Sequence, residues 1–104
     1  MSIRHLEDIT ESIVIRNLRA QTVKMYLEPW GDELPLVPGV TYQIQARGPA
    51  THSLELDLIE EGIVVHSWTG SLLTVFSGSR IVRDCRPRVP SLPGSPGSGF
   101  EPGS

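Results

Sequence analysis

The densest group of side chains able to bind a ligand surrounds Trp30, in the segment YLEPWGDE. Glu28, Asp32 and Glu33 place three carboxylates within three residues of this indole. Carboxylates from a loop can bind a cation, and an exposed indole can stack on a small ligand. The run lacks the alternate-position oxygen ligands of a calcium loop, so a solvated acidic loop is the competing interpretation. We interpret Trp30 as a lid that covers the end of a small core. The alternative is an exposed platform in a ligand site with these carboxylates.

Other residues capable of catalysis or metal binding lack the required spacing. His5, His52 and His66 share no helical or alternate-strand spacing, so a zinc site would need three remote segments to converge. Cys85 is followed by RPRVPSLPG, without the histidine and methionine that a type 1 copper loop supplies. The sequence contains no nucleophile elbow and no phosphate-binding loop. We therefore predict no catalytic residue, no metal and no cofactor.

The charge distribution argues against several classes of partner. The formal net charge is −3, and residues 1–85 carry seven Lys/Arg against eleven Asp/Glu. Nucleic-acid binding requires clustered cations, so an acidic chain without a basic stripe is not expected to bind it. No segment is apolar enough to span a membrane, and the charged start MSIRHLEDITES lacks the apolar core of a signal peptide. Together with the single cysteine, these features predict a cytoplasmic protein that binds neither nucleic acid nor a membrane.

Apolar and polar residues alternate along most of the chain, with turn residues roughly every ten positions. This pattern is typical of an all-β fold, and we expect a seven-stranded antiparallel sandwich. The expected strands are 12–17, 22–28, 40–47, 53–60, 63–69, 71–77 and 81–84. The segment 29–39 is expected to be a long packed loop that crosses from one sheet to the other.

The composition changes sharply after Cys85. Residues 86–104 contain five prolines, four glycines and four serines, so they have little apolar surface to bury on ordering. We therefore place a β-sandwich domain at residues 1–85 and a disordered Pro/Gly/Ser-rich tail at residues 86–104. Prolines at every third position from Pro87 to Pro96 favour an extended tether.

The segments 63–68 and 72–76 are apolar on both faces and carry no charged side chain. Strands of this kind are buried on both faces, either by their own chain or by a partner. The internal cover would be the N-terminal segment or the Trp30 loop. The alternative is a homodimer or another protein partner, and its candidate interface consists of Val65, Trp68, Leu72, Leu73, Val75 and Phe76.

The pattern LEPWG followed by LxPGxxYxIxAxGP, in residues 27–49, resembles a family of small uncharacterised bacterial proteins. The resemblance implies a bacterial origin and an immunoglobulin- or cupredoxin-like sandwich, and it brings no activity, substrate or catalytic residue. The predicted function is a non-catalytic protein-interaction or structural module. One alternative is a small-ligand or metal binder that uses the Trp30 loop. A second is a small enzyme without a recognisable motif.

Overall fold

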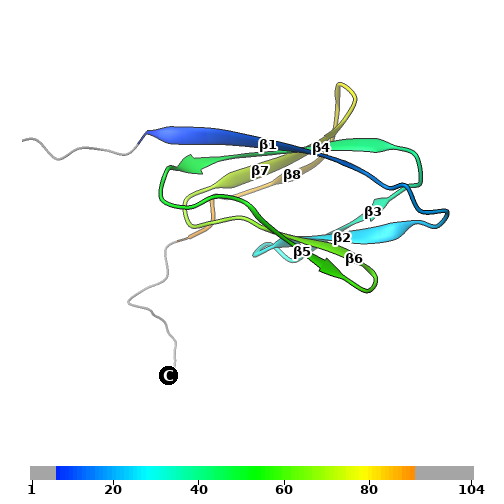
Figure 1. The fold of residues 1–104 in the computed structure, drawn as a ribbon. Coiled ribbons are helices and arrows are strands. Elements are labelled where there is room, and N and C mark those ends of the chain that lie inside the picture. The colour runs from blue at the N-terminus through cyan, green and yellow to red at the C-terminus, as the bar shows by residue number, and fades with distance from the viewer. Residues whose placement is uncertain (1–6, 91–104) are drawn as a thin grey trace, which may run out of the picture.

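The computed structural model describes residues 7–90, which form eight β-strands in two packed layers (Figure 1). Within these residues the chain forms no helix that could cross a membrane. The strands are β1 (Asp8–Arg16), β2 (Val23–Glu28), β3 (Asp32–Leu36), β4 (Thr41–Pro49), β5 (Glu55–Ile59), β6 (Gly62–His66), β7 (Leu72–Ser77) and β8 (Arg80–Cys85). The predicted all-β class is confirmed, with eight strands rather than seven.

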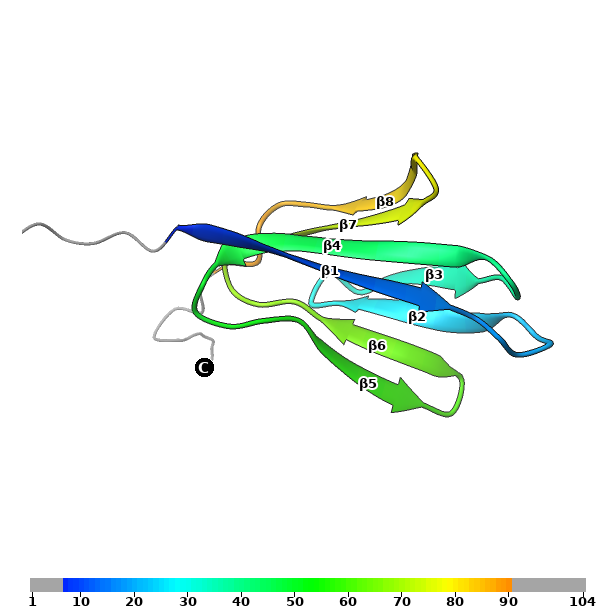
Figure 2. The same ribbon diagram turned by 45° about the horizontal axis from the view of Figure 1, so that its top comes forward.

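Each layer is a four-stranded sheet. One has the order β1-β4-β7-β8 and is antiparallel throughout. The other has the order β3-β2-β6-β5, in which β2 and β6 run parallel (Figure 2). The expectation of a wholly antiparallel sandwich is therefore wrong at one pairing. Parallel neighbours need a long crossover connection, and here the chain passes through β3, β4 and β5 before β6 returns beside β2.

Inward-facing side chains from both sheets form one core. Alternation along β4 buries Tyr42, Ile44 and Ala46 and leaves Thr41 and Gln43 exposed, as a two-faced strand requires. The cluster contains Met25, Leu27, Leu34, Leu36, Tyr42, Ile44, Ile63, Val65, Leu73, Val75 and Cys85. Half-buried side chains, including Trp30, pack against its margin.

The segment expected to be a crossing loop contains an additional strand, β3. It pairs antiparallel with β2, and the tight turn between them ends at Gly31, whose φ of 76° suits glycine. Pro35 obscured this strand, because proline removes a backbone donor and is tolerated only at a sheet edge. β3 is an edge strand, and Leu34 and Leu36 on either side of Pro35 face the core.

The chain crosses between the sheets at Ser67–Ser71, so β6 and β7 do not form a hairpin. Each occupies an inner position of its own sheet, which explains why neither strand needs charged side chains against edge pairing. Val65, Leu73 and Val75 are fully buried within the chain, so they cannot form the surface interface considered above. Trp68 is also buried, whereas Leu72 and Phe76 are half-buried on the outer face of β7.

The parallel pair is unusually close where Gly62 lies opposite Lys24. A Cβ atom on Gly62 would lie 1.8 Å from the Lys24 carbonyl oxygen, which is far below any contact distance. Beside this point, the Lys24 amide donates to the Glu61 carbonyl at 3.0 Å. Glycine is therefore required at position 62 for space alone.

We predict that Gly62→Ala destabilises the protein by about 3 kcal/mol, because the added methyl forces the two strands apart. Gly31→Ala is the matched control: its site is open, so only the positive φ opposes alanine, at about 1 kcal/mol. Urea denaturation followed by tryptophan fluorescence measures both changes. Equal stability of Gly62→Ala and the wild type would contradict the close approach.

Candidate functional site

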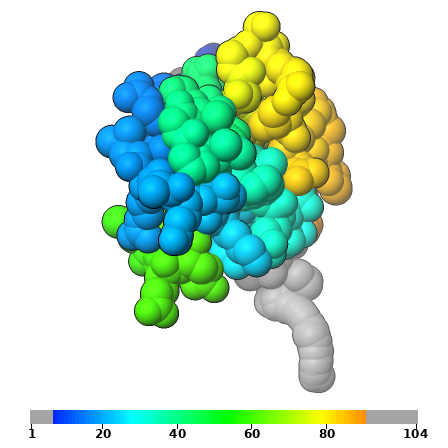
Figure 3. Space-filling model, turned by 90° about the vertical axis from the view of Figure 1, so that its right-hand side faces the viewer, coloured from blue at the N-terminus to red at the C-terminus, as the bar shows by residue number. Residues whose placement is uncertain are grey.

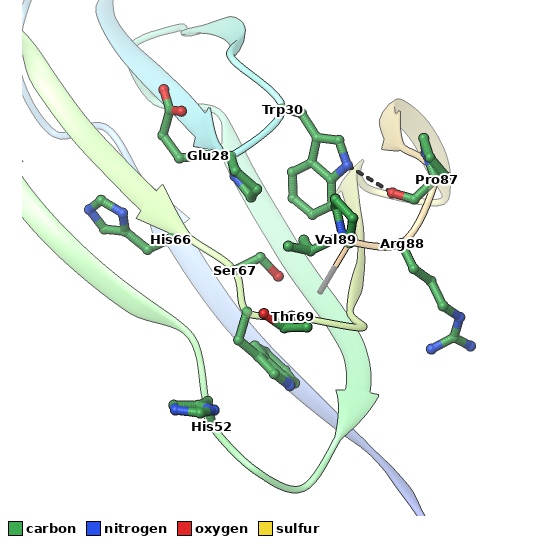
Figure 4. Close-up of a pocket in the computed structure, with 12 residues that line it drawn as sticks. Glu28, Trp30, His52, His66, Ser67, Thr69, Pro87, Arg88 and Val89 are labelled. Atoms are coloured by element: carbon green, nitrogen blue, oxygen red, sulfur yellow. Dashed lines mark hydrogen bonds between the residues drawn. The ribbon is translucent and has the colours of Figure 1, made fainter. Parts of the chain in front are cut away.

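A cleft of about 560 Å³ opens at the end of the sandwich where β2 and β6 finish (Figure 4). Its walls come from the turn after β2, the connection before β5, the β6–β7 crossing and the segment after β8. The lining residues are Glu28, Pro29, Trp30, His52, His66, Ser67, Trp68, Thr69, Pro87, Arg88, Val89 and Pro90. The volume lies within the range of small-molecule sites.

Two indoles form apolar walls of this cleft. Trp30 Nε1 donates to the Pro87 carbonyl at 2.9 Å, as Figure 4 shows, and Trp68 Nε1 donates to the Pro49 carbonyl at 2.8 Å. Both donors are satisfied within the protein, so each ring can offer an incoming group its faces and not a hydrogen bond. Trp30 therefore combines the two interpretations, since it packs against the core and also lines a cleft.

The β6–β7 crossing is held by Ser71, which is fully buried. Its hydroxyl donates to the Trp68 carbonyl at 2.5 Å and accepts from the Trp68 amide at 3.1 Å. It also contacts the hydroxyl of Ser67 on the cleft wall. These bonds fix the backbone that carries the Trp68 ring, so this wall of the cleft is built on a rigid turn.

The segment 86–90 packs against the sandwich and completes the cleft. The Val89 amide donates to the Ser71 carbonyl at 3.0 Å, and the Val89 carbonyl accepts from the Gly70 amide at 2.7 Å. The Arg88 guanidinium donates to the Gly70 carbonyl at 2.7 Å and lies 3.2 Å from an Asp8 carboxylate oxygen. Residues 86–90, which the sequence assigned to the tail, therefore pack against the sandwich. The disorder predicted for the rest of the tail concerns residues 91–104, which lie outside the described residues.

The four residues of the predicted loop site do not converge. Glu28 and Trp30 line the cleft, but Asp32 and Glu33 already belong to β3. An Asp32 carboxylate oxygen accepts from the Cys85 thiol at 3.4 Å. Glu33 forms an ion pair with Lys24 at 3.3 Å, and its hydrogen bond and charge raise the Lys24 pKa. Among the described residues, no group of three or more His, Cys, Asp and Glu side chains is placed to hold a metal.

Cys85 is a poor candidate nucleophile. Burial, and secondarily the Asp32 carboxylate, raise the pKa of its thiol to about 12. The thiolate is the reactive form, so this side chain stays protonated and inert at neutral pH. Its role is in the core cluster.

Two histidines line the cleft that the sequence did not bring together. His52 precedes β5 and His66 ends β6, and Figure 4 places both along one wall. His66 Nε2 lies 2.9 Å from an Asp57 carboxylate oxygen on the neighbouring strand. The segment before β5 lies beside the end of β6 because β5 pairs with β6 in a register that matches Glu55 with His66. Only that pairing could have indicated that His52 and His66 line the same cleft.

A second exposed feature lies along β5, at the open side of the sandwich. Leu58 is 87% exposed, and Leu56 and Ile59 are each 37% exposed. Leu56 and Leu58 pair with buried Val65 and Ile63, so they lie on the core side as alternation predicted, yet the opposing sheet leaves them uncovered. In Figure 3 the β5–β6 hairpin projects, in green, below the blue N-terminal segments. An apolar groove of about 240 Å³, lined by Ile15, Leu18, Leu58, Ile59 and neighbouring residues, continues this surface.

Comparison of the chain with protein-family models, curated proteins and solved structures found no match. The resemblance to small bacterial proteins thus stays a prediction.

We predict that Trp30→Phe loosens the segment 86–90, because it removes the hydrogen bond to the Pro87 carbonyl. The loss of one such bond costs about 1 kcal/mol, so opening of the segment should increase roughly fivefold. Trypsin cleavage between Arg88 and Val89, followed by mass spectrometry, measures this opening. Cleavage after Arg19, in the β1–β2 connection, is the internal control and should not change. An unaltered rate at Arg88 would show that Trp30 does not hold the segment.

Proposed function

We propose that this protein is a non-catalytic protein-interaction module that binds its partner along the open β5 side. One observation supports this above the others: Leu56 and Leu58 are exposed on the core side of β5, and Leu58 and Ile59 line the adjoining apolar groove. Single exposed apolar residues are ordinary on protein surfaces, but a contiguous patch next to a groove marks an interaction site. The inert thiol and the dispersed carboxylates favour binding over catalysis.

The proposal includes the finer features expected from the sequence. An immunoglobulin- or cupredoxin-like sandwich in a bacterial cytoplasm is compatible with the two-sheet architecture. Self-association through Leu72 and Phe76, the two candidate interface residues that are only half-buried, is a further form of the same function.

We predict that Leu58→Glu removes most partner binding. Burial of one leucine contributes about 1.5–3 kcal/mol, so its loss should weaken a complex by roughly tenfold or more. Ile81→Glu is the matched control, because Ile81 is 56% exposed on β8, the edge strand at the other side. Immobilised wild type and Ile81→Glu should retain the same proteins from a bacterial lysate, and Leu58→Glu should not. Equal retention by all three would refute the proposal.

A second candidate function is the binding of a small, largely apolar ligand in the Trp30 cleft. The observation in its favour is a cavity of suitable size with two indole walls and a few polar groups on Glu28, His52 and His66. The satisfied indole donors favour stacking or apolar contact over hydrogen bonding to these rings.

We predict for this candidate that a ligand in the cleft changes the fluorescence of Trp30 and raises the melting temperature. A panel of metabolites and metal ions, measured by both methods, tests it. Thr69 lines the cleft and is exposed, so Thr69→Trp should fill the cleft with a larger side chain and leave the fold intact. This variant should no longer respond to the ligand. No response from any compound would count against the cleft as a small-molecule site.

A further inference from the structure

The two sheets present four edge strands, and three of them carry features that block further strand pairing. β3 contains Pro35. The register of β8 shifts at Val75/Phe76 of β7, and its Arg83 points across to the Glu33 carbonyl at 3.1 Å. β1 directs Glu11 inward, where its carboxylate accepts from the amide of Leu54, just before β5, at 2.8 Å. Proline, irregular register and inward-pointing charge are the usual protections of an edge.

β5 has none of these three features. Its five residues, ELDLI, are regular, all exposed, and paired on one side only, with β6. The opposite side of the strand therefore presents backbone donors and acceptors that a further strand can use. Among the four edges, β5 is the one prepared for an added strand.

The carboxylates of β5 and of the turn that follows it form an acidic cluster. Glu55 and Asp57 share the outer face of the strand, and Glu60 and Glu61 follow in the turn. From residue 48 to residue 79 the sequence contains no lysine or arginine. Such a strand repels another acidic strand, including β5 of a second copy, and attracts a basic one. Arg16 and Arg19 line the adjoining groove and limit the acidic region there.

We propose that β5 binds an extended protein segment in which basic and apolar residues alternate. The segment adds a fifth strand to the β3-β2-β6-β5 sheet. Its apolar side chains cover Leu56 and Leu58, and its basic side chains lie next to Glu55 and Asp57, because alternate residues of a strand face opposite sides. This inference specifies the partner of the proposed interaction module, and so it rests on that function.

The test uses a peptide of seven residues with uncharged, capped ends, in which lysine and valine alternate. It is long enough to cover the five residues of β5. Amide shifts of the ¹⁵N-labelled full chain should change in β5 and β6 on titration. A peptide of the same composition, with its lysines and valines in separate blocks, should bind roughly tenfold more weakly, since it cannot satisfy both faces at once. Equal binding of the two peptides, or shifts centred elsewhere, would overturn the proposal.

Variants separate the role of β5 from general attraction to an acidic protein. Glu55→Lys/Asp57→Lys should bind the alternating peptide roughly tenfold more weakly, because attraction becomes repulsion at both positions. Glu33→Lys/Asp84→Lys changes the net charge equally on the β3 and β8 side and should leave the affinity unchanged. Equal losses in both variants would reduce the effect to net charge and overturn the inference.

The remaining outcomes also separate the partner from the function. Failure of the peptide to bind, with lysate binding still lost in Leu58→Glu, would refute the basic partner and leave the interaction module standing. Concentration-dependent sedimentation of the peptide-free protein, abolished by Leu58→Glu, would identify a second copy as the occupant and overturn the basic partner. If Leu58→Glu still binds both the peptide and the lysate proteins, the basic partner and the interaction module are both refuted.

Discussion

The parallel pairing of β2 with β6 determines where the Trp30 cleft of this protein lies. Gly62 permits it, because only a residue without a Cβ can approach the Lys24 carbonyl so closely. Parallel strands finish at the same end, so the Trp30 turn after Glu28 and the Trp68 crossing after His66 emerge side by side. The Ser67 amide joins them directly by donating to the Glu28 carbonyl at 3.0 Å. The cleft is thus a consequence of strand direction in the middle of one sheet.

Local pattern was sufficient to predict the all-β class and most strands, because alternation in segments such as Tyr42–Ala46 reflects burial of one face. Local pattern could not predict which strands pair with each other, since the parallel pairing joins residues nearly forty positions apart. β3 was missed because Pro35 argues against a strand in any position except an edge. Of the four candidate site residues, Glu28 and Trp30 line the cleft, whereas strand geometry in β3 directs Asp32 and Glu33 into other contacts. His66 joined the cleft through a pairing that spacing does not reveal.

The two exposed apolar regions, the Trp30 cleft and the β5 side, differ in how far the chain itself covers them. At the Trp30 end its own C-terminal segment covers part of the indole and satisfies the ring nitrogen. At β5 nothing in the described chain covers Leu58, although a leucine in water forgoes the free energy of burial. A stable fold with a complete core elsewhere can tolerate this exposure, and an edge without proline, bulge or inward-pointing charge stays open to pairing with a strand of complementary charge.

The contact between Arg88 and Asp8 has a topological meaning beyond the strength of an exposed ion pair. It brings the first strand and the last described segment to one spot, so the path of the chain nearly closes on itself. A short linker between these segments could join them, and new ends could be opened at the exposed turn around Gly78. Such a circular permutant would begin with β8 and would keep every strand pairing described here. The order of the strands along the chain is, in this sense, separable from their arrangement in space.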